Sequence, residues 1–158
     1  MRTCTRWACL AAAVALFAPA LASAGEYRGE KTVPLSKDGI VALDLEVGPV
    51  LVNELVLRGV PDAEELASMP GEKTIEPRPV SVTTNRGGEE VEMRLDATFF
   101  DDQGAIVYAC GNGNLEQDEE TFNEVRRVCS VASGGSVTAA KWSKVTSVKL
   151  QVSLHETD

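Results

Sequence analysis

The sequence has little of the chemistry from which most active sites are built. It contains one histidine and four cysteines, and aromatic residues make up only 5% of it. No Gly-x-Ser-x-Gly sequence occurs, and "GNGN" at 111–114 lacks the Lys and Ser/Thr of a phosphate-binding loop. Serine–histidine catalysis would depend on His155 alone, which is close to the C-terminal end and expected to fray. We therefore expect no enzyme activity and no cofactor.

Acidic residues are the exception to this scarcity, with 24 Asp and Glu against 15 Lys and Arg. A pair of carboxylates could support glycoside hydrolysis, so a carboxylate-dependent hydrolase is a weaker alternative. Most of the acids, however, alternate outward on expected strands or cluster at expected helix starts, where water solvates them. The six aromatic residues after position 24 are also few for a sugar-stacking surface.

The first 24 residues have the three-part pattern of a secretory signal peptide. Arg2 and Arg6 precede an apolar run at 10–21, and small residues follow at 22–24. The run is shorter than the roughly 20 residues that a membrane-spanning helix needs. The sequence thus predicts a signal peptide at 1–24 and one exported domain at 25–158. That domain would lie in the periplasm or outside the cell, with no membrane insertion.

Charge limits the partners of the exported domain. After removal of the two arginines of the signal, 13 basic residues face 24 acidic ones, a net charge of −11. Such a surface repels nucleic acid and anionic lipid, and it attracts cations and basic proteins.

Two cysteines remain after position 24, Cys110 and Cys129. An even pair in an exported protein predicts a disulfide. In the chain-entropy model, closing a loop of about 20 residues stabilises the fold by roughly 3 kcal/mol. A metal site would need more ligands than these cysteines and one histidine supply.

Apolar and polar residues alternate with a period of two along much of the chain, which is typical of half-buried antiparallel strands. The clearest runs are 41–47, 91–100 and 148–154, and further strands are expected at 50–59, 80–84, 105–110 and 136–142. Residues 25–38 suit a loose terminus or an edge strand. About seven strands with one or two short helices predict an immunoglobulin-like β-sandwich, with a β-barrel as the alternative.

Two segments have helical signals instead. Residues 61–71 offer Asp62 as an N-cap, and "PG" at 70–71 would end the helix. Residues 115–129 have Thr121 and Glu124 at capping-box spacing, with acids at the start and arginines near the end.

The helix expected at 115–129 is the predicted binding surface, because a sandwich needs fewer residues to join two strands. Its candidate partner-binding residues are Glu116, Asp118, Glu119, Glu120 and Phe122. They indicate a basic protein partner. An equally weighted alternative is a structural role, in which Phe122 and Val125 close one end of the sandwich.

The segment "FFDDQGAIVYACGNGN" at 99–114 suggests either a turn or a calcium loop. Asp101 and Gly104 suit a four-residue hairpin turn between two strands. The EF-hand pattern fails when it starts at Asp101, and again when it starts at Asn112. The turn is therefore predicted, no metal ligands are assigned, and an acidic calcium-binding module remains an alternative function.

The stretch "ATFFDDQGAIV" at 97–107 resembles the signature of FxLYD domains, in which an apolar strand ends in an aromatic residue and an aspartate before a short turn. Asp101 matches that aspartate. Residues 133–154 are similar to the closing part of the same family. The resemblance implies a small exported immunoglobulin-like domain without catalytic residues. Its work would be protein binding or cell-envelope architecture.

The predicted disulfide can be tested on the exported protein. Alkylation without reduction should label neither Cys110 nor Cys129, and labelling after reduction should modify both. Quantitative labelling of both thiols before reduction would contradict the disulfide.

Overall fold

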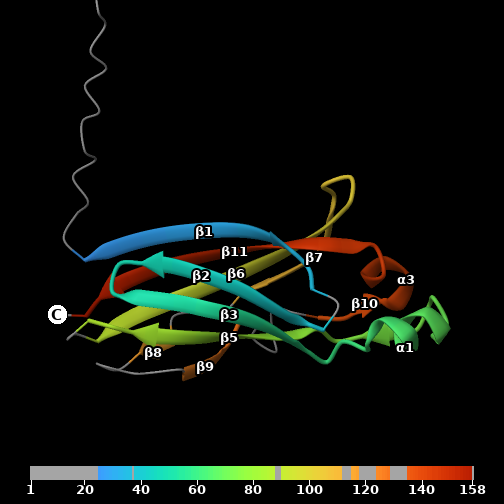
Figure 1. The fold of residues 1–158 in the computed structure, drawn as a ribbon, viewed down its shortest axis with the longest axis horizontal. Coiled ribbons are helices and arrows are strands. Elements are labelled where there is room, and N and C mark those ends of the chain that lie inside the picture. The colour runs from blue at the N-terminus through green and yellow to red at the C-terminus, as the bar shows by residue number, and fades with distance from the viewer. Residues whose placement is uncertain are drawn as a thin grey trace, which may run out of the picture.

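The computed structural model describes residues 25–36, 38–87, 90–111, 115–117, 124–128 and 135–157. They form two large antiparallel sheets that enclose one hydrophobic core, and a third sheet of two short strands (Figure 1). The prediction of a mainly β sandwich with two short helices is confirmed. The predicted signal at 1–24 lies outside the described residues.

The larger sheet, named sheet A here, has the strand order β1-β11-β6-β7, and β8 also pairs with β6. Its strands are β1 (Glu26–Pro34), β11 (Val145–Glu156), β6 (Val91–Asp101), β7 (Ile106–Gly111) and β8 (Leu115–Gln117). Of the two alternatives for residues 25–38, the structure shows the edge strand.

The second sheet, named sheet B, has the order β2-β3-β5-β9. It contains β2 (Ile40–Val47), β3 (Val50–Arg58), β5 (Arg78–Asn85) and β9 (Glu124–Arg127). One end of the sandwich carries α1 (Ala63–Ser68), α3 (Ala139–Trp142) and a small sheet of β4 (Thr74–Ile75) and β10 (Val137–Thr138) (Figure 1). All predicted strands except 136–142 are confirmed.

The inward side chains of β6 and β11 supply much of the core. On β6 they are Val91, Met93, Leu95, Ala97 and Phe99, and on β11 they are Val148, Leu150, Val152 and Leu154. Each is at most 2% exposed. Burial of one such large side chain contributes about 1.5–3 kcal/mol, so this alternation stabilises the pairing of the two strands.

An aromatic cluster fills the core between sheet A and α3. The ring centroid of Phe99 lies 5.9 Å from that of Tyr108 and 5.1 Å from that of Trp142. Trp142 is 3% exposed and therefore packs in the core. Burial, and then the negative charge of Glu76, raise the pKa of Tyr108 above its ordinary value.

The strand predicted at 136–142 is wrong beyond Thr138. Residues 139–142 form the helical turn α3, and the Ala139 N–H donates to the carbonyl of Lys73 over 2.8 Å. Ala139 and Trp142 are both buried, whereas the two residues between them are exposed. A separation of three residues places two side chains on one face of a helix and on opposite faces of a strand.

The helix predicted at 115–129 is also wrong wherever the structure describes that segment. Residues 115–117 pair with β6 as β8, and residues 124–127 pair with β5 as β9. Glu124 thus lies in a strand, whereas Thr121 lies outside the described residues. The free edge of β5 offers a full row of backbone hydrogen bonds, and this tertiary pairing outweighs the local capping signal.

Three polar side chains of β5 face the core, although the alternation of apolar and polar residues predicts apolar side chains there. Ser81, Thr83 and Asn85 are each 0% exposed, whereas Val82 is half-buried. Thr83 and Asn85 have hydrogen bonds that make their burial tolerable. Thr83 donates to the Glu124 carbonyl of β9 over 3.5 Å, and the Asn85 side chain accepts from the Gly87 N–H over 3.0 Å.

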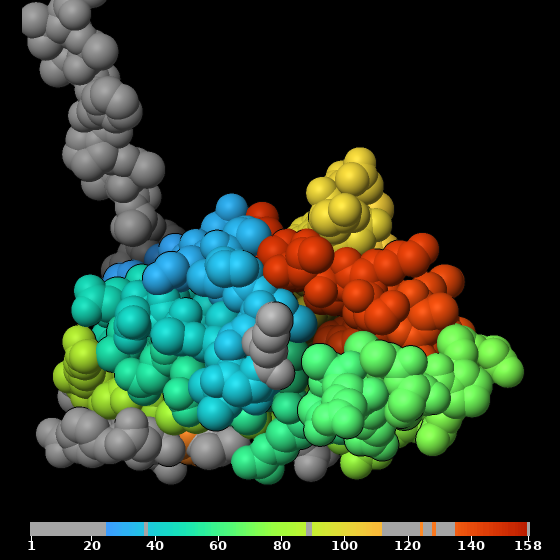
Figure 2. Space-filling view, turned by 45° about the vertical axis from the view of Figure 1, so that its right-hand side comes forward, coloured from blue at the N-terminus to red at the C-terminus, as the bar shows by residue number. Residues whose placement is uncertain are grey.

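Two aspartates have the structural roles that their positions predicted. The Asp62 side chain accepts from the backbone N–H groups of Glu64 and Glu65 over 3.0 and 2.8 Å and so caps α1. The Asp101 side chain accepts from the N–H of Ala105 over 2.8 Å and closes the turn between β6 and β7. This turn lies at the tip of a hairpin that projects from the molecule (Figures 1 and 2).

The edge strand β1 packs against β2, and glycines allow the close approach. A Cβ atom on Gly29 would lie 2.5 Å from Val47 Cγ2, and one on Gly48 would lie 2.5 Å from the Tyr27 ring. The Tyr27 hydroxyl donates to Glu156 Oε1 over 2.9 Å. Figure 2 shows β1 in blue directly against the cyan and teal surface of β2 and β3.

Replacing Gly48 by Ala tests the close packing of Tyr27 on Gly48, and replacing Gly104 by Ala measures the cost of backbone strain alone. Gly48 and Gly104 both have positive φ, of 51° and 78°, but nothing lies within 4 Å of a Cβ on Gly104. Gly104→Ala should therefore destabilise the fold by about 1–2 kcal/mol through its backbone alone. Gly48→Ala should cost about 1–3 kcal/mol more because of the clash with Tyr27. Equal costs in urea unfolding would contradict the close packing of Tyr27 on Gly48.

Candidate functional site

Four rows of side chains cross the outer face of sheet A. Paired residues of neighbouring strands point to the same side, so β1, β11 and β6 contribute one residue each to every row. From the first row to the fourth they are Glu26–His155–Glu92, Arg28–Ser153–Arg94, Glu30–Gln151–Asp96 and Thr32–Lys149–Thr98. The charges alternate as acidic, basic, acidic and basic along the strands.

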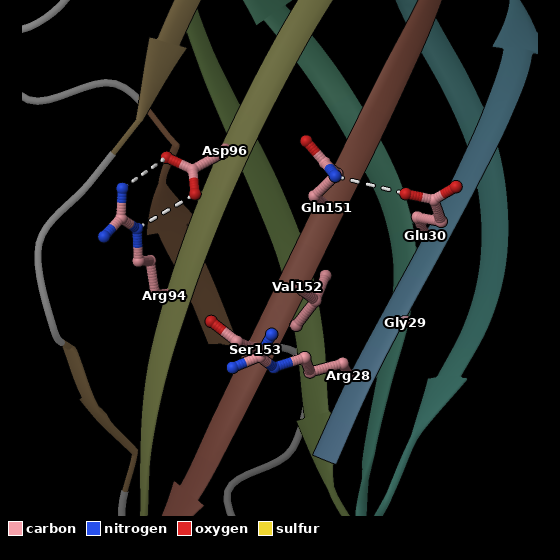
Figure 3. Close-up of a pocket in the computed structure, with 8 residues that line it drawn as sticks. All are labelled: Arg28, Gly29, Glu30, Arg94, Asp96, Gln151, Val152 and Ser153. Carbon is pink, nitrogen blue, oxygen red and sulfur yellow. Dashed lines mark hydrogen bonds and ion pairs between the residues drawn. The ribbon is translucent and has the colours of Figure 1, made fainter. Parts of the chain in front are cut away.

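A shallow hollow of about 650 Å³ lies on this face, where rows two and three meet. Figure 3 shows Arg28 extending from β1 toward β11, with Arg94 and Asp96 facing each other beside β6. Charged and amide groups line the hollow from all three strands.

The arginines of row two each bond an acid two residues away on their own strand. The Arg28 Nε donates to Glu26 Oε1 over 2.9 Å. Arg94 is bidentate with Asp96, with Nε and Nη2 distances of 2.9 and 3.4 Å. These contacts hold the guanidinium groups along the strands, and the Arg28 side chain remains 77% exposed.

Glu30 joins row three to row four. Its Oε2 lies 2.8 Å from Lys149 Nζ and accepts from Gln151 Nε2 over 3.1 Å (Figure 3 shows the second contact). The hydrogen bond from Lys149 is the main reason why the pKa of Glu30 lies below its ordinary value. Exposed pairs of this kind contribute little to the stability of the fold, so the charges of the rows are better suited to recognition of a partner.

His155 has a different position from the one expected. It is not at a frayed end but in β11, paired with Glu26 and Glu92 in row one. Its side chain is exposed. Among the residues that the structure describes, no group of three or more His, Cys, Asp or Glu side chains could hold a metal ion.

The structure places one of the predicted partner-binding residues beside this face. Glu116 lies in β8, at the register position opposite Glu92 of row one. The other four, Asp118, Glu119, Glu120 and Phe122, lie outside the described residues. Residues of rows two and three were not predicted as a site, although their outward positions follow from the alternation.

The predicted disulfide involves one described residue. Cys110 lies on β7, faces the core and is 7% exposed. Cys129 lies outside the described residues, so their pairing stays a prediction.

A second, smaller hollow of about 260 Å³ lies at the end of the sandwich, between α1 and the segment that contains α3. Figure 2 shows these segments side by side in green and orange-red. Leu35, Leu57 and Leu66 are among its apolar lining residues. Asp38 lies at the same hollow, where the Ser36 hydroxyl lowers the pKa of its carboxyl. These leucines also pack against the core, so the hollow is partly a packing feature.

Comparison with known proteins does not assign this chain to a family. No model of a protein family matches the chain, and no curated protein matches it. Within the described ranges, no helix has the length and apolar character needed to span a membrane.

Replacing Lys149 by Met should raise the pKa of Glu30 toward 4.5, its ordinary value. The folded-state pKa is lowered, so the stabilisation from this pair is present above about pH 4.5 and is lost as the pH falls through the folded-state value. Side-chain NMR titration of Glu30 measures the change. Lys144→Met is the control, because Lys144 is exposed in the turn after α3. An unchanged Glu30 pKa in Lys149→Met would contradict the pairing.

Proposed function

We propose that this chain is an exported, non-catalytic, immunoglobulin-like β-sandwich module that binds a protein through the outer face of sheet A. The observation that carries the proposal is the alternation of charge across its four rows. Export is supported by the signal pattern at 1–24, and the immunoglobulin-like assignment by the resemblance to FxLYD domains.

The exposure of the rows supports a role in recognition. The side chains of Arg28, Arg94 and Glu30 are 77%, 58% and 59% exposed. Ion pairs nevertheless orient these side chains before a partner binds. Binding therefore costs less side-chain entropy than it would if the same side chains were free to rotate. Oriented charges provide specificity and a faster association rate more than raw affinity.

The spacing of the rows favours a protein over a small ligand. Successive rows are two residues apart along each strand, which is about 6.8 Å in an antiparallel sheet. Four such rows form an extended and largely flat charge pattern, whereas small molecules are usually bound in deeper, apolar pockets. A protein surface with charges at matching intervals can contact several rows at once.

Reversal of charge in row two tests the proposal. The double variant R28E/R94E should lose capture of its protein partner from an envelope extract, because both basic groups of the row become acidic. The matched control is R78E/R86E, which causes the same change in net charge. It also breaks two exposed ion pairs, Arg78–Glu76 at 2.8 Å and Arg86–Glu46 at 3.3 Å, away from rows one to four.

Circular dichroism and thermal melting of each variant verify that the fold is intact. The proposal predicts that capture is lost in R28E/R94E and retained in R78E/R86E. Equal capture by both folded variants and the original chain would show that the outer face of sheet A is not the binding surface.

A further inference from the structure

We propose that the protein bound by the outer face of sheet A is a second copy of this chain. The two copies would dock face to face with their β11 strands antiparallel. This inference rests on the proposed function, since it names the partner of the same face.

The order of the rows makes the face complementary to itself. Two copies that meet face to face can be related by a twofold axis that lies between them and runs across the strands. Such an axis reverses the order of the rows, so row one faces row four and row two faces row three. The basic row two then lies over the acidic row three of the other copy, and Lys149 of row four lies over His155, between the two acids of row one.

The same axis keeps each strand over its own counterpart. Arg28 of β1 therefore lies over Glu30 of the second copy, and Arg94 of β6 lies over Asp96 of the second copy. Symmetry generates each contact twice. On β11, Ser153 faces Gln151, so a hydroxyl meets an amide in the centre of the interface.

The alternative twofold axis, parallel to the strands, is disfavoured by the same charges. It would place every row over the same row of the other copy and β1 over β6, so that Arg28 would face Arg94 and Glu30 would face Asp96. Like charges directly opposite each other repel. The row order thus selects the antiparallel arrangement.

The ion pairs within one copy leave groups available for contacts between copies. The described contacts of Arg28 and Arg94 use Nε and Nη2, and a guanidinium has five N–H donors. Each arginine can therefore keep its own acid and also donate to a carboxylate of the second copy. Water can fill the two facing hollows, as it does in many polar interfaces.

An interface of exposed charges is weak and sensitive to salt. Sedimentation velocity over a range of protein concentrations should show a reversible monomer–dimer equilibrium at an ionic strength of about 0.1 M, where a Debye length of about 10 Å screens the net repulsion between two acidic copies more than it screens the close ion pairs. At about 1 M, where that length is about 3 Å, the dimer should dissociate.

Two single substitutions on β1 test the geometry. In R28E, an acid at position 28 would face Glu30 of the second copy, and in E30K a lysine at position 30 would face Arg28. Either variant alone should raise the dissociation constant about tenfold or more, because two exposed attractive contacts become repulsive. Both sites are highly exposed, so the fold should tolerate the changes.

Mixing the two variants should restore dimers. Each contact would then join one acidic and one basic group again, so R28E and E30K should associate with each other but not with themselves. R78E is the control, because Arg78 is 70% exposed and pairs with Glu76 outside the four rows. It should dimerise like the original chain.

Three results would overturn the inference. They are a chain that stays monomeric at low salt, dimers that persist in R28E, or a mixture of R28E and E30K that does not associate. Monomers at low salt, combined with loss of partner capture in R28E/R94E, would leave the proposed function in place with a different protein as partner. Monomers at low salt, combined with unchanged capture by R28E/R94E, would remove the proposed function as well.

Discussion

The pairing of β6 with β11 is the constraint on which both the core and the charged face depend. The two strands are in register from Val91 opposite Glu156 to Phe99 opposite Val148. Because side chains alternate between faces, this one register places nine apolar residues inside and the central and β6 positions of all four rows outside. A slip of one residue would bury Arg94 and Asp96 and expose Leu95, which the burial energy of the core forbids.

The row pattern also requires that β1 hold its position at the edge of the sheet. Backbone pairing with β11 fixes its register, and packing against β2 fixes its other side. The Lys31 ammonium donates to the carbonyl of Leu43, beside Asp44, whose φ of 45° marks an irregularity in β2. Gly29 allows the two strands to approach closely. An edge strand anchored on both sides presents Arg28 and Glu30 in fixed places.

Much of the fold could be predicted from local patterns, and the failures have physical causes. Alternation identified β6 and β11 because both lie with one face on the core and one in water. The capping and spacing signals within 115–129 favoured a helix, but residues 115–117 pair with β6 and residues 124–127 pair with β5. Alternation also misplaced the inner row of β5, since Thr83 and Asn85 are buried with hydrogen bonds that local sequence does not reveal. The charged face could not be predicted, because β1, β11 and β6 are neighbours in space but far apart in the chain.

The most direct test of this account is the cross-strand register in solution, measured by backbone NOEs in NMR spectra of the labelled protein. The pairing of β1, β11 and β6 predicts NOEs that place Ser153 between Arg28 and Arg94, and Gln151 between Glu30 and Asp96. A slip of two residues would keep the apolar side chains inside and yet misalign the rows, so core burial alone cannot test the point. NOEs that pair Ser153 with Asp96, or Gln151 with Arg94, would contradict the account.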